Sequence, residues 1–377
     1  MAADKIKILF FHFDLGYGGA ERVLVNLLNN LNPDKYDITL ITLFHHGVAA
    51  KDLHANVRWK WVLDRKPFRG ITYLLRLFSP KLLHKLFIRD KYDIEIAYIE
   101  GSPTRIISGC QDDDTKKYAW VHVQIDNFKQ FFHPFRSKSE VIRCYNRFDG
   151  LAGVSEFIAD DFQLKTQNHI QPLSVVHNVV EVEDIVKQGQ EPISIRLNPQ
   201  KINICSVGRF NIQKGYDRLI RSLIMLKEEG IDCFHLYLIG IGELKEEISR
   251  MVDKSAIKDD VTFLGYQENP HKYVSKMDFF VCSSYREGYS TAVTESILNH
   301  TPVLTTECSG MREILGNDGA GIIVDNDERA LCDSLRLILT DQALREECRK
   351  KAIERAAYFS KENAIKQFER FIGTHTI

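Results

Sequence analysis

The feature that most constrains the fold is a regular alternation of short apolar runs with helical patterns through the second half of the chain. The apolar runs have the length of buried strands, and apolar residues recur at helical spacing between them. We place the strands at 202–207, 234–239, 261–264, 278–282, 303–305 and 321–324. Helices are expected at about 215–228, 243–251, 271–274, 291–299, 311–315, 327–339, 342–358 and 361–372. Strands that alternate with helices form a parallel sheet covered on both faces. The pattern therefore predicts a doubly wound α/β domain.

The first half of the chain shows the same alternation less regularly. Strands are expected at 6–11, 37–43, 93–98, 117–121, 151–154 and 173–176, with helices after the first strand and at 155–163. A chain of 377 residues is too long for one typical core. We therefore expect two Rossmann-like domains, at 1–187 and 201–358. The polar segment 188–200, which contains two prolines, is predicted as the linker between them.

Bulk properties exclude several classes of protein. The formal net charge is −1, so no global field favours nucleic acid. The eight cysteines are scattered without a CxxC pair, which is typical of small core residues in a reduced cytoplasmic protein. No apolar run approaches transmembrane length, and the N-terminus leads directly into a strand, so neither a membrane span nor a signal peptide is expected.

The stretch from Asp278 to Ser296 has the features of an anion site. A strand ends in a turn around Gly288 and opens a helix, with Ser290 or Thr291 expected to cap it. Free backbone N–H groups and the positive end of the helix dipole favour an anion there. Two carboxylates, Glu287 and Glu295, flank this position. Because carboxylates suit sugar hydroxyls rather than phosphate, the combination indicates a sugar nucleotide.

A second loop, from Gly208 to Gly215, follows the first strand of the second domain and carries Arg209 and Lys214. A guanidinium and an ammonium placed around one loop can hold a diphosphate from two directions. Exposed Arg and Lys residues are often only surface, but this loop should share the strand edge with Glu287. We interpret the two cations as a diphosphate clamp.

The loop after the first strand contains Gly18 and Gly19, and it stands where a dinucleotide-binding Rossmann unit has its glycine loop. The third glycine position of that motif holds Glu21, and the second strand ends without an acidic residue to bind a ribose. Dinucleotide binding is therefore rejected. The glycines fit a tight turn that also lets a ligand approach the backbone.

Two further groups lie in loops after strands of the first domain. His122 follows the strand at 117–121, at the end where open α/β sheets bind ligands. A lone histidine is more often structural, but this position favours a functional role. The run Asp112-Asp113-Asp114 imitates an acidic metal motif, yet it sits in a polar loop and fits a solvated turn better. No other cluster has the spacing of metal ligands, so no metal and no cofactor is expected.

Residues 65–91 combine basic and apolar side chains with a break at Ser79-Pro80. The pattern is that of a basic amphipathic helix suited to an anionic membrane surface. An equally simple interpretation is two surface helices whose leucines pack on the sheet. Both interpretations stay open at this point.

Four short patterns together resemble those of the family 4 retaining glycosyltransferases of GT-B fold, over essentially the whole chain. They are Gly18-Gly19-Ala20-Glu21-Arg22, Val207-Gly208-Arg209 with Lys214-Gly215, Leu238-Ile239-Gly240 with Gly242-Glu243, and Glu287 with Glu295 at the E-x7-E spacing. The stretches 287–292 and 308–313 resemble bacterial surface-polysaccharide members. The resemblance implies two Rossmann-like domains facing a cleft, with the last helix, within 359–377, packing back on the N-terminal domain.

The resemblance also implies roles for individual residues. The catalytic set would be Arg209, Lys214, Glu287 and His122. The donor-binding set would be Gly18, Gly19, Tyr289, Ser290, Thr291 and Glu295. In these roles the two cations hold the donor diphosphate, Glu287 binds hydroxyls of the transferred sugar and Glu295 binds the ribose. Ser290 and Ser296 stand where the family commonly has glycine and alanine, which leaves the donor's identity open.

The expected activity is metal-independent transfer of a hexose, with retention, from a nucleotide diphosphate sugar, with UDP as the expected nucleotide. The expected acceptor is a saccharide or a lipid-linked saccharide in polysaccharide biosynthesis. The protein would be cytoplasmic and would contact the inner face of the plasma membrane through residues 65–91. Two alternatives remain: a GT-B sugar-nucleotide epimerase, and a sugar-nucleotide-binding protein without catalysis.

Overall fold

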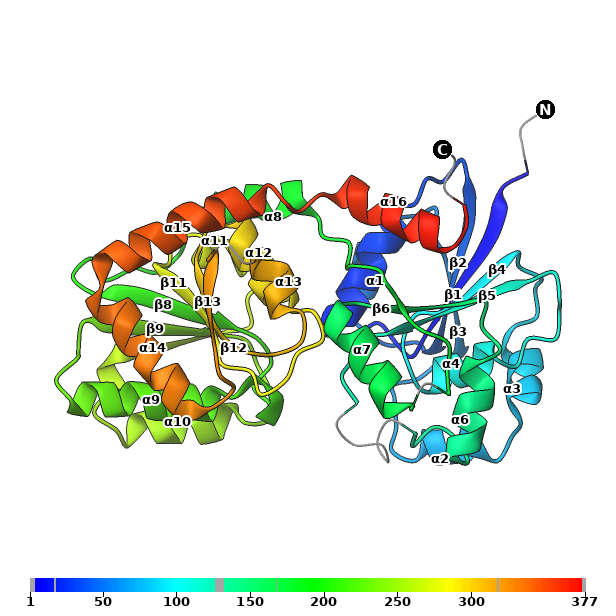
Figure 1. Ribbon diagram of the computed structural model, residues 1–377, viewed down its shortest axis with the longest axis horizontal. Coiled ribbons are helices and arrows are strands. Elements are labelled where there is room, and N and C mark those ends of the chain that lie inside the picture. The colour runs from blue at the N-terminus through cyan, green and yellow to red at the C-terminus, as the bar shows by residue number, and fades with distance from the viewer. Residues whose placement is uncertain (1–3, 17, 126–131, 168, 317–318, 375–377) are drawn as a thin grey trace. The chain divides into compact units, whose positions relative to one another are not determined.

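Each half of the chain forms its own parallel sheet with helices on both faces (Figure 1). The computed structural model describes residues 4–16, 18–125, 132–167, 169–316 and 319–374. The chain divides into a first unit, residues 1–180 with 361–377, and a second unit, residues 181–360. The expectation of two doubly wound α/β sheets is confirmed.

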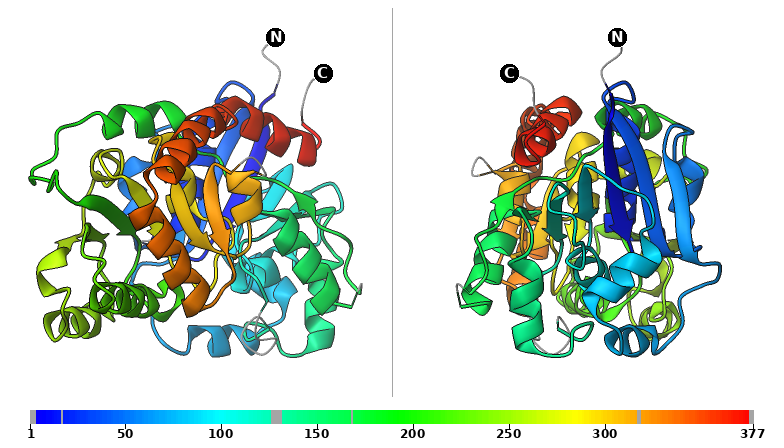
Figure 2. Two further views of the ribbon diagram at one scale, coloured as in Figure 1. Left: turned by 60° about the vertical axis from the view of Figure 1, so that its left-hand side comes forward. Right: turned by 90° about the vertical axis from the view of Figure 1, so that its right-hand side faces the viewer.

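Among the described residues, the first unit has seven strands in the order β3-β2-β1-β4-β5-β6-β7, and every pair is parallel. The strands are β1 Ile6–His12, β2 Tyr36–Phe44, β3 Arg58–Leu63, β4 Ile94–Ala97, β5 Lys116–Val121, β6 Gly150–Gly153 and β7 Ser174–Val175. The helices are α1 Gly19–Asn30, η1 Ala49–Asp52, α2 Ile71–Arg76, α3 Pro80–Phe87, α4 Ser102–Ile107, α6 Lys138–Tyr145, α7 Glu156–Lys165 and α16 Lys361–Phe371. The three blue strands β1, β2 and β3 can be followed side by side in Figure 2.

In the second unit, the part of the chain that the structure describes has six parallel strands in the order β10-β9-β8-β11-β12-β13. The strands are β8 Ile202–Val207, β9 Phe234–Ile239, β10 Val261–Gly265, β11 Phe279–Cys282, β12 Val303–Thr306 and β13 Gly321–Val324. The helices are α8 Val182–Gly189, η2 Ile212–Lys214, α9 Tyr216–Glu228, α10 Lys245–Asp253, η3 Lys258–Asp260, α11 His271–Val274, α12 Thr291–Leu298, α13 Met311–Leu315, α14 Glu328–Thr340 and α15 Gln342–Ala356. All six strands lie where the sequence predicted them, within two residues at each end.

Strand order reverses between β1 and β4 in the first sheet and between β8 and β11 in the second. At such a switch point the loops after two neighbouring strands leave in opposite directions, and ligands of open α/β sheets bind there. The residues that follow these four strands are therefore the positions to examine for function.

The terminal helix α16 packs on the first unit, as predicted. The Phe368 ring stacks on Phe10 of β1 with a centroid distance of 6.0 Å, and Phe371 meets Trp120 of β5 edge-on at 5.1 Å. An ion pair of 2.9 Å joins Glu369 to Lys35. These contacts bury the helix on the sheet across a sequence separation of more than 200 residues. Residues 375–377 of the predicted 359–377 segment lie outside the described residues.

Two predictions of organisation need correction. The segment 188–200, predicted as a linker, lies within the second unit, and the chain passes between units at Val180–Glu181 instead. The reason is that α8 docks on the second unit: Ser275 Oγ donates to the Gly189 carbonyl at 2.6 Å, and Asn269 Nδ2 donates to that of Gln188 at 3.0 Å. The edge strand β3 was not predicted, because its exposed, alternating charged and aromatic residues lack an apolar run.

Candidate functional site

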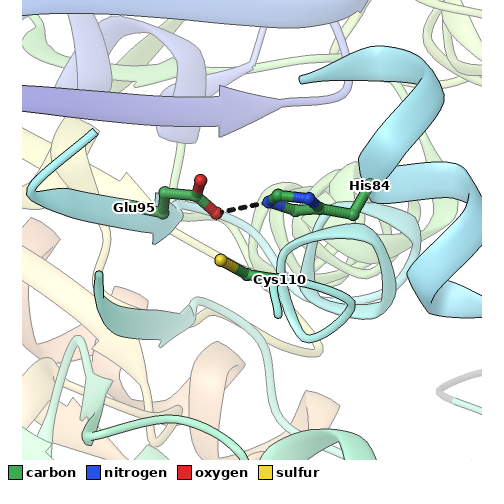
Figure 3. A group of neighbouring side chains, drawn as sticks. All are labelled: His84, Glu95 and Cys110. Carbon is green, nitrogen blue, oxygen red and sulfur yellow. Dashed lines mark hydrogen bonds and ion pairs between the residues drawn. The ribbon is translucent and has the colours of Figure 1, made fainter. Parts of the chain in front are cut away.

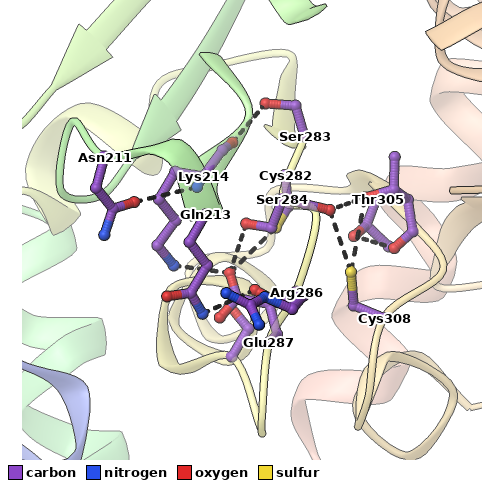
Figure 4. Close-up of polar contacts among 12 residues, drawn as sticks. Asn211, Gln213, Lys214, Cys282, Ser283, Ser284, Arg286, Glu287, Thr305 and Cys308 are labelled. Carbon is purple, nitrogen blue, oxygen red and sulfur yellow. Dashed lines mark hydrogen bonds and ion pairs between the residues drawn. The ribbon is translucent and has the colours of Figure 1, made fainter. Parts of the chain in front are cut away.

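The loops after β8 and β11 meet at the switch point of the second sheet (Figure 4). Lys214 comes from the first loop and Glu287 from the second, and Lys214 Nζ lies 2.7 Å from Glu287 Oε1. Ser284 Oγ donates to the same carboxylate oxygen at 2.6 Å. The exposed fractions of the two charged side chains are only 21% and 9%. The structure therefore brings together a buried ion pair from two residues that the sequence assigned to one site.

Lys214 stays charged in this environment. Burial alone would lower the pKa of Lys214, but the negative charge of Glu287, with smaller contributions from Cys282 and Tyr216, raises it above its usual range. An ammonium has three N–H donors, and Glu287 occupies one of them. Lys214 can therefore bind a phosphate oxygen without releasing its carboxylate partner.

Backbone contacts hold the two loops together. Gly215 has φ +60°, and a Cβ there would lie 2.1 Å from the Ser283 carbonyl oxygen, so only glycine fits this approach. Ser283 Oγ donates to the Lys214 carbonyl at 3.0 Å. Arg218, at the start of α9, donates from Nε to the Ser283 carbonyl at 2.8 Å and from Nη2 to that of Ser284 at 2.5 Å. Arg218, which no motif in the sequence singled out, therefore fixes the loop after β11 to the start of α9.

Arg209 is placed differently from Lys214. Its side chain is 65% exposed, and its Nε lies 3.5 Å from Glu243 Oε2 of the loop after β9. Glycines bring that loop close: a Cβ at Gly242 would lie 2.4 Å from the Phe210 carbonyl oxygen. The two cations of the expected clamp therefore differ. Lys214 is largely buried and pairs with Glu287, whereas Arg209 is exposed and pairs with Glu243.

The N-terminus of α12 completes this group. Ser290 occupies the N-cap position, but its side chain makes no capping hydrogen bond, so the predicted cap is not formed. Its Oγ is buried and has no hydrogen-bond partner. Because the helix lacks a side-chain cap, first-turn N–H groups that the sequence assigned to Thr291 and its neighbours remain available for an anion. An unpartnered buried hydroxyl beside them adds a further donor.

Glu295 lies one turn into α12, apart from the Lys214–Glu287 pair. Its Oε2 is 4.0 Å from His271 Nδ1 of α11, and its side chain is largely buried. Tyr289 is buried behind the loop. The preceding Gly288 is supported from the next loop, where Ser309 Oγ donates to its carbonyl at 2.8 Å. The two glutamates therefore mark two separate positions along one loop and helix.

In the first unit His122 directly follows β5 and is nearly fully buried. Its backbone N–H donates to Glu100 Oε2 at 3.0 Å, and its ring lies 5.1 Å from that of Tyr98. Its Nε2 is buried without a hydrogen-bond partner. Burial and the neighbouring His12 lower the pKa of His122 to about 3. His122 is therefore a neutral imidazole at physiological pH, with one ring nitrogen unsatisfied.

A second histidine at this edge was missed by the sequence analysis. His12 ends β1, its side chain is fully buried, and its Nδ1 lies 2.6 Å from the Asp14 carbonyl oxygen. Its Nε2 also has no hydrogen-bond partner. Burial lowers the pKa of His12, so this ring is neutral too. The rule that selected His122, a polar residue at the end of a parallel strand, applies equally to His12 and would have found it.

Gly18 and Gly19 begin α1 beside His12's strand. Gly18 is the N-cap of α1 with an extended backbone, and the Glu21 carboxylate lies against its Cα. The acidic run Asp112-Asp113-Asp114, in the loop before β5, forms a turn. The Asp114 N–H donates to Asp112 Oδ1 at 3.0 Å, and Lys91 Nζ pairs with Asp112 at 3.0 Å. Both features are local turns, and only the glycine turn lies at a strand's carboxyl end.

Comparisons with known proteins agree with this arrangement. Residues 17–184 match the family model Glycosyltransferase Family 4, and residues 188–355 match the model Glycosyl transferases group 1. A relative from Campylobacter jejuni, N-acetylgalactosamine-N,N'-diacetylbacillosaminyl-diphospho-undecaprenol 4-alpha-N-acetylgalactosaminyltransferase, is 27% identical over 94% of this chain and 96% of its own length. The lipopolysaccharide core biosynthesis glycosyltransferase LpsE of Rhizobium meliloti is 24% identical over 90% of this chain and 91% of its own.

Solved structures give the same fold. HepE of Anabaena in complex with UDP superposes with a TM-score of 0.75, covering 98% of this chain and 100% of that one at 15% identity. TarM matches with a TM-score of 0.75, covering 98% of this chain and 99% of that one at 12% identity. At these identities the likeness establishes the two-sheet architecture.

Proposed function

This chain belongs to family 4 of the glycosyltransferases, and from that premise we propose that it transfers a hexose from a UDP-hexose to a saccharide or a lipid-linked saccharide, with retention of configuration. The observation that carries the proposal is the buried Lys214–Glu287 pair beside the uncapped N-terminus of α12. A cation and free N–H groups suit a diphosphate, and a carboxylate next to them suits sugar hydroxyls. UDP as the nucleotide is supported by the UDP complexes of HepE, whose fold this chain shares.

The reaction breaks the bond between the anomeric carbon and the diphosphate oxygen, and it forms a bond from that carbon to an acceptor oxygen. Negative charge grows on the leaving diphosphate in a transition state that resembles an oxocarbenium ion. Lys214, Arg209 and the α12 N-terminus would stabilise that charge. The acceptor's proton would pass to an oxygen of the departing diphosphate, which gains negative charge as the bond breaks. These groups would stabilise the negative charge of the leaving diphosphate without a divalent metal.

The glutamates and histidines would position the donor. Glu287 is held by Lys214 and Ser284, so it is oriented rather than free to act as a nucleophile. We assign it to hydroxyls of the transferred sugar, and Glu295 to the ribose. His122, neutral and with an unpartnered Nε2, would accept or donate one hydrogen bond with the sugar.

The reaction is tested by product analysis. Purified protein would be incubated with UDP-hexoses, with and without saccharide acceptors, and the products identified by mass spectrometry and by NMR of the new anomeric centre. An α-product from an α-donor supports the proposal. A converted donor sugar without acceptor would indicate the epimerase, and donor binding without turnover would indicate the binding protein. A β-product from an α-donor would contradict retention.

Metal independence is tested separately. We expect transfer to continue when EDTA is added to the assay, because Lys214 and Arg209 take the place of a divalent ion. Complete loss restored by Mn²⁺ would contradict this mechanism. The control is the same assay with Mg²⁺ in excess, which should not raise the initial rate.

A lipid-linked acceptor is supported by the name of the Campylobacter relative, which includes diphospho-undecaprenol. The surface of α2 and α3 offers a matching feature, which we call the basic–apolar face. Its exposed apolar members are Tyr73, Leu74, Leu77, Phe78, Leu82 and Leu86, and its exposed basic members are Arg69, Lys81, Lys85 and Arg89. The opposite side of these helices packs inward through Ile71, Leu75 and Leu83. The buried side of these helices fits the interpretation as surface helices packed on the first unit. The exposed side is the one that a membrane surface would contact.

We propose that the basic–apolar face binds an anionic membrane surface reversibly. Within the described part of the chain, Lys81, Lys85 and Arg89 form no ion pair, so their charge is available to lipid headgroups. Each basic residue near an anionic surface contributes about 1 kcal/mol. Across the described residues no helix is both long and apolar enough to span a membrane.

The face is tested by co-sedimentation with vesicles of phosphatidylglycerol and phosphatidylcholine. Binding should weaken as salt rises. Replacing Lys81, Lys85 and Arg89 together by Glu should abolish binding, whereas the same change at Lys245, Arg250 and Lys254 on the other unit should not. Equal sedimentation of the two triple variants would contradict the assignment. A soluble acceptor would then fit better.

A further inference from the structure

Three side chains that the transfer mechanism does not use converge on the inner side of α3 (Figure 3). His84 comes from α3, Glu95 from β4 and Cys110 from the segment after α4. His84 Nε2 lies 2.8 Å from Glu95 Oε2, and the ligand atoms of all three residues lie within 4.8 Å of one another. Glu95 and Cys110 are almost fully buried, and His84 is 14% exposed. Imidazole, carboxylate and thiol thus share one small interior space.

The scaffold around this cluster is tightly constrained. Gly109 lies against the start of α3 so closely that a Cβ there would be 2.1 Å from the Pro80 carbonyl oxygen. The carbonyl of Cys110 accepts from Arg147 Nη2 at 2.7 Å and from Gln111 Nε2 at 3.1 Å. The positions of His84 and Cys110 are therefore set by packing and by hydrogen bonds outside the cluster. Fixed donors of this kind are what a preorganised metal site needs.

We propose that His84, Glu95 and Cys110 bind a zinc ion. Zinc takes nitrogen, sulfur and carboxylate oxygen ligands in tetrahedral geometry, and three protein ligands leave one position for water. A thiolate and an imidazole disfavour Mg²⁺ and Ca²⁺, which prefer oxygen ligands. Spacing in the sequence did not reveal the cluster, because each residue belongs to a different element.

The ligand set balances the charge of the ion. A bound carboxylate and a bound thiolate together carry two negative charges, which neutralise Zn²⁺, and the imidazole binds as a neutral ring. Because these ligands must be deprotonated to bind, protons compete with zinc, and the affinity should increase with pH.

A bound ion would join α3 to the sheet. The inner side of α3 carries His84, and its outer side carries Lys81 and Lys85 of the basic–apolar face. The three tryptophans, Trp59, Trp61 and Trp120, all lie in the first unit. Their fluorescence therefore reports the stability of the unit that holds the cluster, separately from the second unit.

The test uses the full-length protein, stripped with EDTA and dialysed, then titrated with Co²⁺ and Zn²⁺. Cobalt should bind with a stoichiometry of one and show a near-ultraviolet band from thiolate-to-metal charge transfer, and Zn²⁺ should displace it. Zinc should raise the midpoint of thermal unfolding followed by tryptophan fluorescence. Calorimetry at several pH values should show a zinc affinity that rises with pH, because protons compete for the ligands.

Matched variants separate the cluster from other thiols. Cys110→Ser should lose the charge-transfer band, whereas Cys144→Ser, which removes an equally buried cysteine of the same unit, should keep it. His84→Asn should weaken cobalt binding at least tenfold and serves if Cys110→Ser fails to fold. Absence of metal binding by the wild type, or identical spectra of Cys110→Ser and wild type, would overturn the proposal. The second result would indicate an adventitious ion only.

The outcome does not depend on the transferase. A stripped protein that still transfers sugar supports metal-independent transfer, and the cobalt titration then decides the zinc site by itself. The two are separable because Glu95 lies on β4 before the strand's carboxyl end, and His84 and Cys110 lie on other elements. Loss of activity restored by Zn²⁺ would leave the zinc site in place, whereas loss restored by Mn²⁺ would contradict metal-independent transfer.

Discussion

The carboxyl ends of the two parallel sheets carry groups of opposite kind, charged in the second unit and neutral in the first. In the second unit the loops after β8 and β11 hold Lys214 and Glu287 as a largely buried charged pair. In the first unit the ends of β1 and β5 hold His12 and His122 as buried neutral rings. Both groups lie at the edge of a parallel sheet where ligands of open α/β sheets bind, so their electrostatics can be compared.

The difference shows how a buried group keeps or loses its charge. A cation next to a carboxylate keeps its proton, because the pair compensates the cost of burial. At His12 burial outweighs the charges of Glu21 and Asp14, and at His122 burial and the neighbouring His12 act together, so each ring loses its proton instead. One edge therefore suits a group that gains negative charge, and the other suits uncharged hydroxyls.

The largest expected effect tests the charged edge. Arg209→Ala should lower kcat roughly ten- to a thousandfold, because its guanidinium would stabilise charge that grows on the leaving diphosphate. Arg209 is exposed, so the stability of the protein should change little. Steady-state kinetics with a UDP-hexose and acceptor would measure the effect.

The control for this prediction is Arg336→Ala. Arg336 is also a partly exposed arginine of the second unit and pairs with Glu229 at 2.7 Å, away from the loops after β8 and β11. It should leave kcat unchanged. If both variants keep full turnover, the cationic role of Arg209 is wrong.

The next effect tests the neutral edge through pH. Below pH 6.5 the unfolded chain protonates His122, but the folded protein resists protonation down to about pH 3. Stability from this residue is therefore complete above pH 6.5 and is lost as pH falls toward 3, by about 2 kcal/mol at pH 5. Urea unfolding followed by tryptophan fluorescence at pH 7.5 and pH 5 would measure the loss in the first unit.

In His122→Phe this part of the pH dependence should disappear, because phenylalanine takes up no proton. His54→Phe, at an exposed histidine of the same unit, should keep the wild-type dependence. Equal losses in His122→Phe and wild type would show that His122 is protonated in the folded state. The contrast between the two edges would then fail.

Much of the charged edge could be predicted from the sequence, for a physical reason. Arg209, Lys214, Glu287 and Glu295 each lie within a few residues of a strand or helix whose apolar pattern is clear. In a parallel sheet, local position after a strand already determines which residues share an edge. The two loops could therefore be placed together without knowing any tertiary contact.

The parts that were missed depend on contacts between distant segments. Arg218 sits in an ordinary amphipathic helix, and only the folded structure shows that it binds the carbonyls of Ser283 and Ser284. The cluster of His84, Glu95 and Cys110 likewise has no signature in spacing. The predicted position of the linker was wrong because a segment has the same polar composition whether it forms a free loop or docks on a domain.

The smallest expected effect separates the two glutamates within the charged edge. Glu295→Gln should weaken the binding of free UDP about tenfold, since a hydrogen bond between a charged group and the ribose contributes roughly 1.5 kcal/mol. Glu287→Gln should leave UDP affinity within about threefold of wild type while it lowers kcat, because its proposed contacts are with the transferred sugar. Loss of the Glu287 charge also removes the partner of Lys214, and a freed ammonium can only strengthen binding of a diphosphate.

Isothermal titration with UDP measures both variants, and Glu328→Gln, on a carboxylate that pairs with Arg221, is the control. If Glu287→Gln weakens UDP binding more than Glu295→Gln does, the two roles are exchanged, and the carboxylate beside Lys214 belongs to the nucleotide rather than to the sugar.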